Sequence, residues 1–512
     1  MRTRWLAVLL PVVSGFQLPF KLPFFNQSGQ QTLQQPPADS KPRIAIIGAG
    51  AGGSSAAFWI SKAKERFGVD VEVDVYEKES YIGGRACSTT VFPYGNSSLP
   101  PVELGASIFV KVNKNMWRAA DEFNLTRLNF RDDDQGMGVW DGEKLLFATT
   151  GGWWGWWDNA KALLRYGFHS PRRTQALVDT MVNKFQSLYA PEVPRWQNIS
   201  HLSSILGWDE LVSQTTSEYL LSNGVSNKFI SELVEGATRV NYGQNADELH
   251  ALEGACSLAA TGASAVEGGN FRIFENFLKQ ANVFLNTSVK SVSQTGTNKW
   301  ALESDRGAEI YTAVILAAPF HSTQLQVPSD ISSQIPPQPY VHLHVTLLTT
   351  TQPSFPAQSF SLPPSTKVPG MLLTTFEGAR NGGKQPEFNS MSYHGLISEG
   401  EWVVKIFSKK RISDKWLSKM FDGQVGWVLR KEWDAYPVLP PSSEFPPTKL
   451  APGFYYVNSF EPFISTMETE ALASRNVVDM LLHESFESGI CGPVGTPLND
   501  TDKEDFVYGW DC

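Results

Sequence analysis

The first long hydrophobic pattern of the chain predicts a strand, a helix and a second strand in direct succession. Residues 43–47 form a short apolar run with β-branched side chains, which is typical of a buried parallel strand. Residues 54–67 place small and apolar side chains on one helical face, and residues 71–76 form a second apolar run that ends at Glu77. Because neighbouring parallel strands need a crossover connection, this order predicts a βαβ unit and an α/β fold.

The turn between the first strand and the helix carries glycines at the spacing of a dinucleotide-binding turn. Gly48 permits the tight turn, Gly50 lets the backbone approach a pyrophosphate, and Gly53 lets the helix pack closely on the strand. The helix N-terminus then offers free N–H groups to phosphates, and Glu77 can accept hydrogen bonds from ribose hydroxyls. The alternative is a glycine-rich turn in another α/β protein, which the flanking strand, helix and acid argue against. The pattern itself does not distinguish FAD from NAD.

Later apolar segments predict strands that return to the same sheet. They are residues 281–289, 311–319 and 453–458, and residues 465–468 then begin a helix whose apolar side chains continue to Leu481. The nucleotide-binding domain is therefore expected to be discontinuous. We predict an α/β fold in which a Rossmann-type domain of several segments accompanies an α+β substrate domain.

The predicted segments run from an N-terminal leader to a polar tail. Their boundaries are a signal peptide at 1–15, a flexible leader at 16–42, nucleotide-binding parts at 43–110, 264–319 and 452–490, substrate-domain parts at 111–263 and 320–451, and a tail at 491–512. In the second substrate part, residues 340–348 alternate with period two, which predicts a strand. His342 and His344 share one face of it. They could ligate a metal, but we expect a surface or core-edge pair, because no further ligand is apparent from the sequence.

The N-terminus has the pattern of an export signal. Arg2 and Arg4 form a basic region, residues 5–13 are apolar, and Ser14 and Gly15 offer a small-residue cleavage site. The apolar run is shorter than the roughly 20 residues that span a bilayer, which argues against a membrane anchor. We therefore expect the secretory pathway, with a lysosome, a vacuole or secretion as the destination.

Composition and cysteine usage agree with this compartment. The net charge of -9 disfavours nucleic acid as a partner, and no partner protein is evident.

Sites that follow the Asn-x-Ser/Thr rule are Asn26, Asn96, Asn124, Asn198, Asn286 and Asn499. Of the four cysteines, Cys491 and Cys512 flank a polar tail and are the expected disulfide pair; the alternative is four free thiols.

Residues 151–157 contain four tryptophans within five positions. Such a stretch suits a tunnel wall, a surface that touches a membrane, or ordinary core packing, because one edge of the indole ring is polar. Core packing and a lipid-facing role both stay open. Peripheral membrane contact is therefore one expectation.

The chain after the βαβ unit resembles the glutathione-reductase-like FAD superfamily that includes the amine oxidases. Residues 79–86 resemble its second glycine-arginine motif, and residues 102–107 resemble the strand that runs beneath the flavin. The resemblance implies an FAD cofactor, with a pyrophosphate contact from the Arg85 guanidinium and a flavin-facing helix N-terminus. The further cofactor-binding residues that it implies are Gly83, Gly84, Gly105, Ala106, Ser107, Val289, Thr466 and Met467.

More specific blocks resemble the prenylcysteine oxidase family. They are residues 44–57, 73–78, 82–85, 242–244, 255–259 and 264–270, and the similarity runs from Arg43 to the helix after Met467. It is weak in the Pro-rich second substrate part.

This resemblance implies a reaction. An S-farnesyl or S-geranylgeranyl cysteine is oxidised at the allylic carbon next to sulfur, with hydride transfer to the flavin. Water then adds, a prenyl aldehyde and L-cysteine leave, and O2 is reduced to H2O2. Tyr242 and Glu267 lie in the family-like blocks and are candidate catalytic residues. Tyr242 could instead only pack on the flavin, and Glu267 could cap the helix near Phe271.

Two other functions are compatible with this architecture. A secreted FAD amine oxidase would share the fold but act on a carbon–nitrogen bond. A non-catalytic prenyl-binding protein of the GDP-dissociation-inhibitor type would not need the flavin contacts, yet this chain keeps them.

Overall fold

The computed structural model describes most of the chain after the leader. The described residues are 41–89, 91, 101–129, 136–149, 155–260, 262–493 and 505–512, without the side chains of 155–157. The predicted signal peptide, nearly all of the leader and the sequons Asn26, Asn96 and Asn499 lie outside them. The Trp-rich stretch also lies outside them, apart from the backbone of its last three residues.

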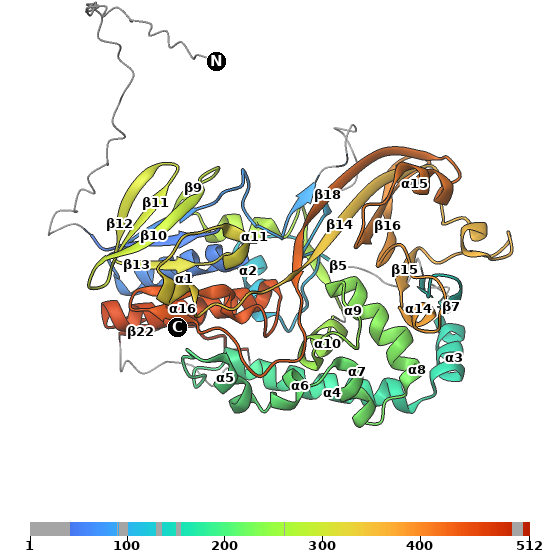
Figure 1. Cartoon of the computed structure of the whole chain (residues 1–512), viewed down its shortest axis with the longest axis horizontal. Helices are drawn as coiled ribbons and strands as arrows, with labels where there is room; N and C mark the ends of the chain where they lie inside the picture. The colour runs from blue at the N-terminus through green and yellow to red at the C-terminus, as the bar shows by residue number, and fades with distance from the viewer. Residues whose placement is uncertain are drawn as a thin grey trace, which may run out of the picture. The chain divides into compact units, whose positions relative to one another are not determined.

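A six-stranded sheet carries the predicted nucleotide-binding unit (Figure 1). Its order is β19 (Lys449–Ala451), β20 (Phe454–Tyr456), β13 (Ala313–Leu316), β1 (Arg43–Ile47), β2 (Glu72–Tyr76) and β9 (Asn282–Phe284). All neighbours are parallel except β19 and β20. Segments from four parts of the chain therefore build one sheet, and the expected discontinuous Rossmann-type domain is confirmed.

Helices cover one face of this sheet and a small meander covers the other. The helices are α1 (Ala51–Phe67), α2 (Lys114–Glu122), α11 (Phe271–Phe277) and α16 (Met467–Phe486); the meander is β10 (Val289–Gly296), β11 (Lys299–Ser304) and β12 (Gly307–Tyr311). The helix α1 packs against α16. A Cβ atom on Gly53 would lie 1.8 Å from the carbonyl oxygen of Gly48, so the close contact of α1 with β1 requires glycine.

A seven-stranded sheet forms the centre of the substrate domain. Its order is β18 (Val425–Pro437), β14 (Tyr340–Thr350), β17 (Glu401–Ser408), β16 (Ser390–Ser398), β15 (Met371–Thr374), β6 (Met137–Trp140) and β7 (Leu145–Ala148). Only β15 and β6 run parallel. The two predicted substrate segments thus share one sheet, and its long strands β14 and β18 lie side by side (Figure 1).

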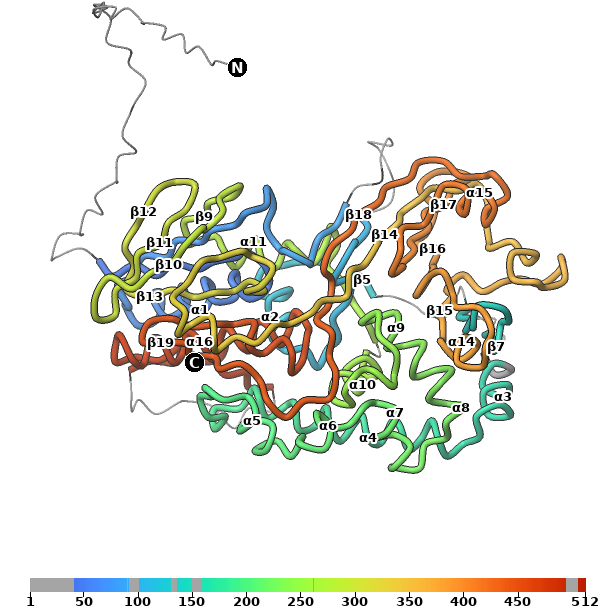
Figure 2. Tube along the Cα trace, in the orientation of Figure 1, coloured from blue at the N-terminus to red at the C-terminus, as the bar shows by residue number. Residues whose placement is uncertain are grey.

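The chain from residue 155 to residue 258 is mostly helical, and its helices form a separate layer (Figure 2). They are α3 (Gly155–Tyr166), α4 (His169–Gln186), α5 (Ile199–Leu206), α6 (Asp209–Ser213), α7 (Thr216–Ser222), α8 (Asn227–Phe229), α9 (Glu235–Tyr242) and α10 (Ala251–Leu258). The short elements are β3 (Ser88–Thr89) with β4 (Val102–Glu103), β5 (Arg127–Asn129) with β8 (Ser264–Val266), β21 (Ser488–Gly489) with β22 (Gly492–Pro493), and the turns η2 (Ser187–Tyr189), η3 (Ile230–Val234), η4 (Ala357–Phe360) and η5 (Val457–Phe460). Two further helices are α14 (Glu377–Arg380) and α15 (Asp414–Met420).

The packing moves two predicted segment boundaries. The helices α12 (Phe320–Thr323) and α13 (Ser329–Ser332) bury apolar side chains in the core of the nucleotide sheet, and β19 pairs within that sheet. Residues 320–335 and 449–451 therefore belong with the nucleotide-binding domain, not with the substrate domain. The sequence pattern could not indicate these two boundaries, because tertiary packing decides in which core these side chains are buried.

The C-terminal tail is held to the nucleotide-binding domain by a disulfide. Cys491 and Cys512 are bonded, which confirms the expected pair, and Cys87 and Cys256 are free. The Trp510 ring packs against Phe58 in the core. Within the described residues, no helix is long and apolar enough to cross a membrane.

Candidate functional site

The glycine loops build a narrow cradle at the N-terminus of α1. Gly83 forms a bridge with Gly50, and its N–H donates to the carbonyl of Ala49 at 2.9 Å. Gly84 has a φ of +58°, and a Cβ atom there would lie 3.1 Å from the Cα of Gly50. The first N–H groups of α1 have no acceptor within the helix. The two backbones therefore meet without side chains, and this geometry fits the pyrophosphate of FAD.

Glu77 is fixed at the end of β2 beside this cradle. Its carboxylate accepts the N–H of Ala49 at 2.8 Å and the N–H of Glu79 at 2.9 Å. Burial raises the pKa of Glu77, and these two hydrogen bonds oppose the rise. Each oxygen keeps a further lone pair, so the side chain can also accept ribose hydroxyls. The segment leading to Val289 is joined to the same place, because the Thr287 N–H donates to the Glu77 carbonyl.

Arg85, which is half-buried, forms an ion pair with the buried Glu461. Its Nη1 donates to a Glu461 oxygen and, at 3.0 Å, to the carbonyl of Ala435 on β18. Burial opposes the charge of Arg85, but Glu461 and the Tyr340 hydroxyl raise its pKa overall. The Tyr340 hydroxyl on β14 donates to Glu461 at 2.7 Å. Arg85 thus joins the glycine loop to both long strands, and its Nε and Nη2 make no hydrogen bond with the described residues.

Two more buried carboxyl groups lie around this ion pair. Glu253 on α10 accepts the N–H of Ser465 at 3.2 Å, and burial raises its pKa to about 8. Burial and repulsion from Glu461 also raise the pKa of Glu470. Burial, helped by the nearby Glu461 charge, therefore favours the protonated form of both Glu253 and Glu470.

The N-terminus of α16 lies in the same region. The Thr466 hydroxyl accepts the N–H of Thr469 at 3.0 Å and caps the helix, and Met467 is buried behind it. A Cβ atom on Gly52 of α1 would lie 2.8 Å from a Glu470 oxygen, so the N-terminal turns of α1 and α16 are close together. Each helix N-terminus carries a partial positive charge, which favours an anion bound beside it.

The predicted flavin strand contains a short paired segment, β4, followed by tight turns. A Cβ atom on Gly105 would lie 2.0 Å from the Arg85 carbonyl and 2.7 Å from the Trp433 ring. The Ala106 N–H donates to the same carbonyl at 2.9 Å, and the Ser107 hydroxyl donates to the Gly105 carbonyl at 2.7 Å. The structure therefore places these residues directly beside Arg85.

Lys405 is a buried cation that sequence reasoning did not identify. Its Nζ donates to the Glu103 carbonyl at 3.1 Å and to the Ser107 hydroxyl at 3.4 Å. Burial lowers the pKa of Lys405 to about 8, and the Glu103 charge opposes this. One feature of the sequence could have indicated that Lys405 is buried. In a strand it lies on the same face as Val403 and Phe407, which are apolar and buried.

Tyr242 lies inside the site, at the end of α9. Its ring meets the Tyr436 ring edge to face at 5.7 Å, and its hydroxyl interacts with the Glu253 carboxyl. Burial, and then Glu253, raise the pKa of Tyr242 well above its usual range. Glu253 was not among the candidates from sequence, although it lies two residues before the family-like block at 255–259.

Glu267 does not reach this site. Its side chain is exposed to solvent, and its carbonyl accepts the Arg272 guanidinium at 2.9 Å. The helix α11 has Asn270 as its N-cap, so Glu267 does not cap it either. Asn270 has the structural role in this block, because its N–H donates to Glu103 and its side chain to the Ala106 carbonyl. The candidate catalytic role of Glu267 is therefore withdrawn.

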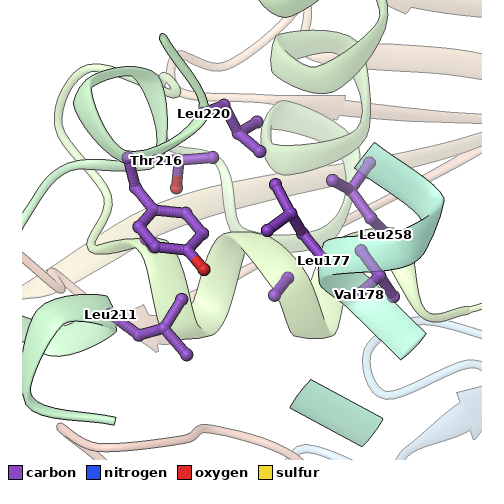
Figure 3. Close-up of a pocket in the computed structure, with 9 residues that line it drawn as sticks. Leu177, Val178, Leu211, Thr216, Leu220 and Leu258 are labelled. Atoms are coloured by element: carbon purple, nitrogen blue, oxygen red, sulfur yellow. The ribbon is translucent and has the colours of Figure 1, made fainter. Parts of the chain in front are cut away.

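An apolar hollow lies away from this site, among the helices α4, α6, α7 and α10 (Figure 3). Its side chains include Leu177, Leu211, Leu220 and Leu258. The space that a water-sized sphere can occupy is about 10 Å³, which is room for no more than one water. A prenyl chain does not fit there unless these side chains move.

Comparison with known proteins agrees with this geometry. The profile of the prenylcysteine lyase family matches residues 150–490, and an NAD(P)-binding Rossmann-like domain profile matches residues 46–123. Farnesylcysteine lyase from Arabidopsis thaliana is 29% identical, covering 87% of this chain and 89% of that protein. Prenylcysteine oxidase 1 from Homo sapiens is 28% identical, covering 88% and 90%.

Solved structures show the same fold. A putrescine oxidase double mutant aligns with a TM-score of 0.57 at 13% identity, covering 86% of this chain and 99% of that one. A putative protoporphyrinogen oxidase from Exiguobacterium aligns with a TM-score of 0.55 at 14% identity, covering 87% and 99%. These structures support the fold, whereas the family profile spans more than half of the chain, so the chain belongs to the prenylcysteine lyase family.

Proposed function

We propose that this chain is an FAD-dependent thioether oxidase that cleaves S-prenyl-L-cysteine with O2 and water to a prenyl aldehyde, L-cysteine and H2O2. The observation that carries the proposal is the side-chain-free cradle beside the Arg85–Glu461 ion pair, in a chain of this family. When bound, FAD supplies the two-electron oxidation of the carbon next to sulfur and passes the electrons to O2.

The protein's own groups manage protons in this reaction. Addition of water to the oxidised carbon releases a proton, and the Glu253 carboxylate is the buried base placed to take it, next to the N-terminus of α16. The neutral acid can then return that proton to sulfur as the carbon–sulfur bond breaks, while the hydroxyl proton leaves to solvent as the aldehyde C=O bond forms. Tyr242 orients the Glu253 carboxyl, and burial of both keeps other water away.

The same proposal includes export and membrane contact. Asn124, Asn198 and Asn286 are exposed, and a disulfide is typical of an oxidising compartment. Leu164 and Phe168 are 89% and 66% exposed near the α3–α4 corner, an arrangement suited to a lipid surface. An endoglycosidase mobility shift tests glycosylation, and co-sedimentation with vesicles tests membrane contact; no shift and no co-sedimentation would contradict these two parts.

Oxygen uptake tests the activity directly. We expect uptake with farnesylcysteine and not with polyamines, because the family acts on a thioether. Gly50→Val should abolish both uptake and the flavin colour, since its side chain enters the cradle at Gly84. Gly296→Ala, at a position with open space around it, is the matched control and should keep both. Uptake only with amines would support the amine oxidase alternative, and a colourless wild type would support the prenyl-binding alternative.

Glu253→Gln tests the proposed base through pH. In the wild type, kcat/KM should rise with pH through about 8 as Glu253 ionises, and the variant should lose this rise. The free energy of unfolding should instead fall as pH rises. The folded pKa lies above the unfolded value, so the wild type loses stability as pH rises from about 4.5 to about 8.

The stability difference provides an independent readout of the same group. Glu253→Gln should therefore gain stability relative to the wild type across this window, measured by thermal unfolding at each pH. Glu275→Gln, on the exposed surface of α11, is the control and should follow the wild type. An unchanged activity profile in Glu253→Gln would rule out the role as base, whatever its stability.

The Lys405→Met variant tests whether the charge of Lys405 serves catalysis or stability. Replacing a buried charge by an apolar side chain of similar length should leave the melting temperature unchanged or raise it. We expect kcat to fall on the order of 100-fold, because the charge beside Ser107 is lost. Lys419→Met on the exposed face of α15 should change neither. Full activity in Lys405→Met would show that the charge is not needed.

A further inference from the structure

Two histidines and two carboxylates form a square on one face of β14 and β18. In the antiparallel register His342 lies opposite Asp434 and His344 lies opposite Glu432. Since side chains alternate along a strand, all four project from the same face. His342 Nδ1 is 3.0 Å from an Asp434 oxygen, and His344 Nδ1 is 3.3 Å from a Glu432 oxygen.

These groups have the ligand chemistry of a zinc site. One ligand atom each from His342, His344 and Glu432 lies within 4.8 Å of the others. Ligands of a tetrahedral zinc ion at roughly 2.0–2.2 Å lie about 3.3 Å apart, so the set must close by roughly 1.5 Å. Glu432 Oε2 already lies 3.3 Å from His344 Nδ1 and 4.0 Å from His342 Nε2. The closing movement therefore falls mainly on His342, whose side chain is 54% exposed, whereas His344 is only 16% exposed and is held by its surroundings.

We propose that His342, His344 and Glu432 bind a zinc ion, with water in the fourth position. The contact of Asp434 with His342 Nδ1 leaves Nε2 of that ring for the metal. A carboxylate that accepts from a ligating imidazole fixes the ring, as in many zinc sites. Imidazole ligands favour zinc and similar transition ions over Mg²⁺ or Ca²⁺, which prefer oxygen.

The proposed zinc site and the Trp433 ring lie on opposite faces of the strand pair formed by β14 and β18. Trp433 falls between Glu432 and Asp434 in sequence, so its ring projects from the opposite face, where it meets Gly105. On the same two strands, the Tyr340 hydroxyl binds Glu461 and the Ala435 carbonyl accepts from Arg85. A zinc ion would therefore clip together the strands that support the Arg85–Glu461 ion pair.

The test is titration of the chelator-treated, flavin-loaded protein with zinc chloride by isothermal calorimetry. We expect one zinc ion per chain with micromolar affinity, and no binding of magnesium chloride under the same conditions. His342→Ala and His344→Ala should each weaken binding at least about tenfold, and Asp434→Asn should weaken it less. Glu432→Gln removes a ligand charge from a side chain that is 63% exposed, so it should weaken zinc binding without affecting folding.

His201→Ala, an exposed histidine on α5, is the matched control and should bind zinc like the wild type. Equal zinc affinity in the wild type and the His342→Ala and His344→Ala variants would place the metal elsewhere and overturn the proposal. Absence of zinc binding in the wild type would overturn it as well, and would leave the four side chains as ion pairs. Neither result bears on oxidation of prenylcysteine, which is measured separately.

Discussion

The ion pair between Arg85 and Glu461 is the contact on which the arrangement of the site depends. Arg85 comes from the second glycine loop, and Glu461 precedes the helix α16. Through the Tyr340 hydroxyl and the Ala435 carbonyl the pair also holds β14 and β18. One half-buried guanidinium therefore connects the nucleotide-binding domain to the sheet of the substrate domain.

The excess of acid around this arginine has a chemical consequence. Glu253 and Glu470 share a buried region with Glu461, and burial raises the pKa of both. A buried carboxyl group whose pKa lies near the working pH can both accept and return a proton. Lys405 contacts Glu103 and Ser107 of the predicted flavin strand, and burial lowers its pKa to about 8. Burial therefore shifts the pKa values of both the acidic groups and this lysine toward neutrality.

Local patterns were sufficient to predict the nucleotide-binding unit. The strand, glycine turn, helix and terminal Glu77 are close in sequence, and their geometry follows from steric and hydrogen-bonding rules. The pairing of Cys491 with Cys512 was also predicted and is confirmed. The site itself depends on contacts between distant segments. Neither the burial of Glu253 and Lys405 nor the exposure of Glu267 could be predicted from motif positions, because burial is set by tertiary packing.

The histidine pair shows the same limit. Period two placed His342 and His344 on one face, but their partners Glu432 and Asp434 are supplied by β18 through the strand register. The Pro-rich second substrate part, which the family profile spans, supplies the contacts of β18 with Arg85 and Gly105.

The most direct test is anaerobic mixing of the purified protein with farnesylcysteine while the flavin absorbance bands are followed. Oxidation of the thioether carbon predicts that these bands bleach in a single turnover and that one prenyl aldehyde is released per flavin. Bands that persist with farnesylcysteine but bleach with an amine would contradict a prenylcysteine oxidase.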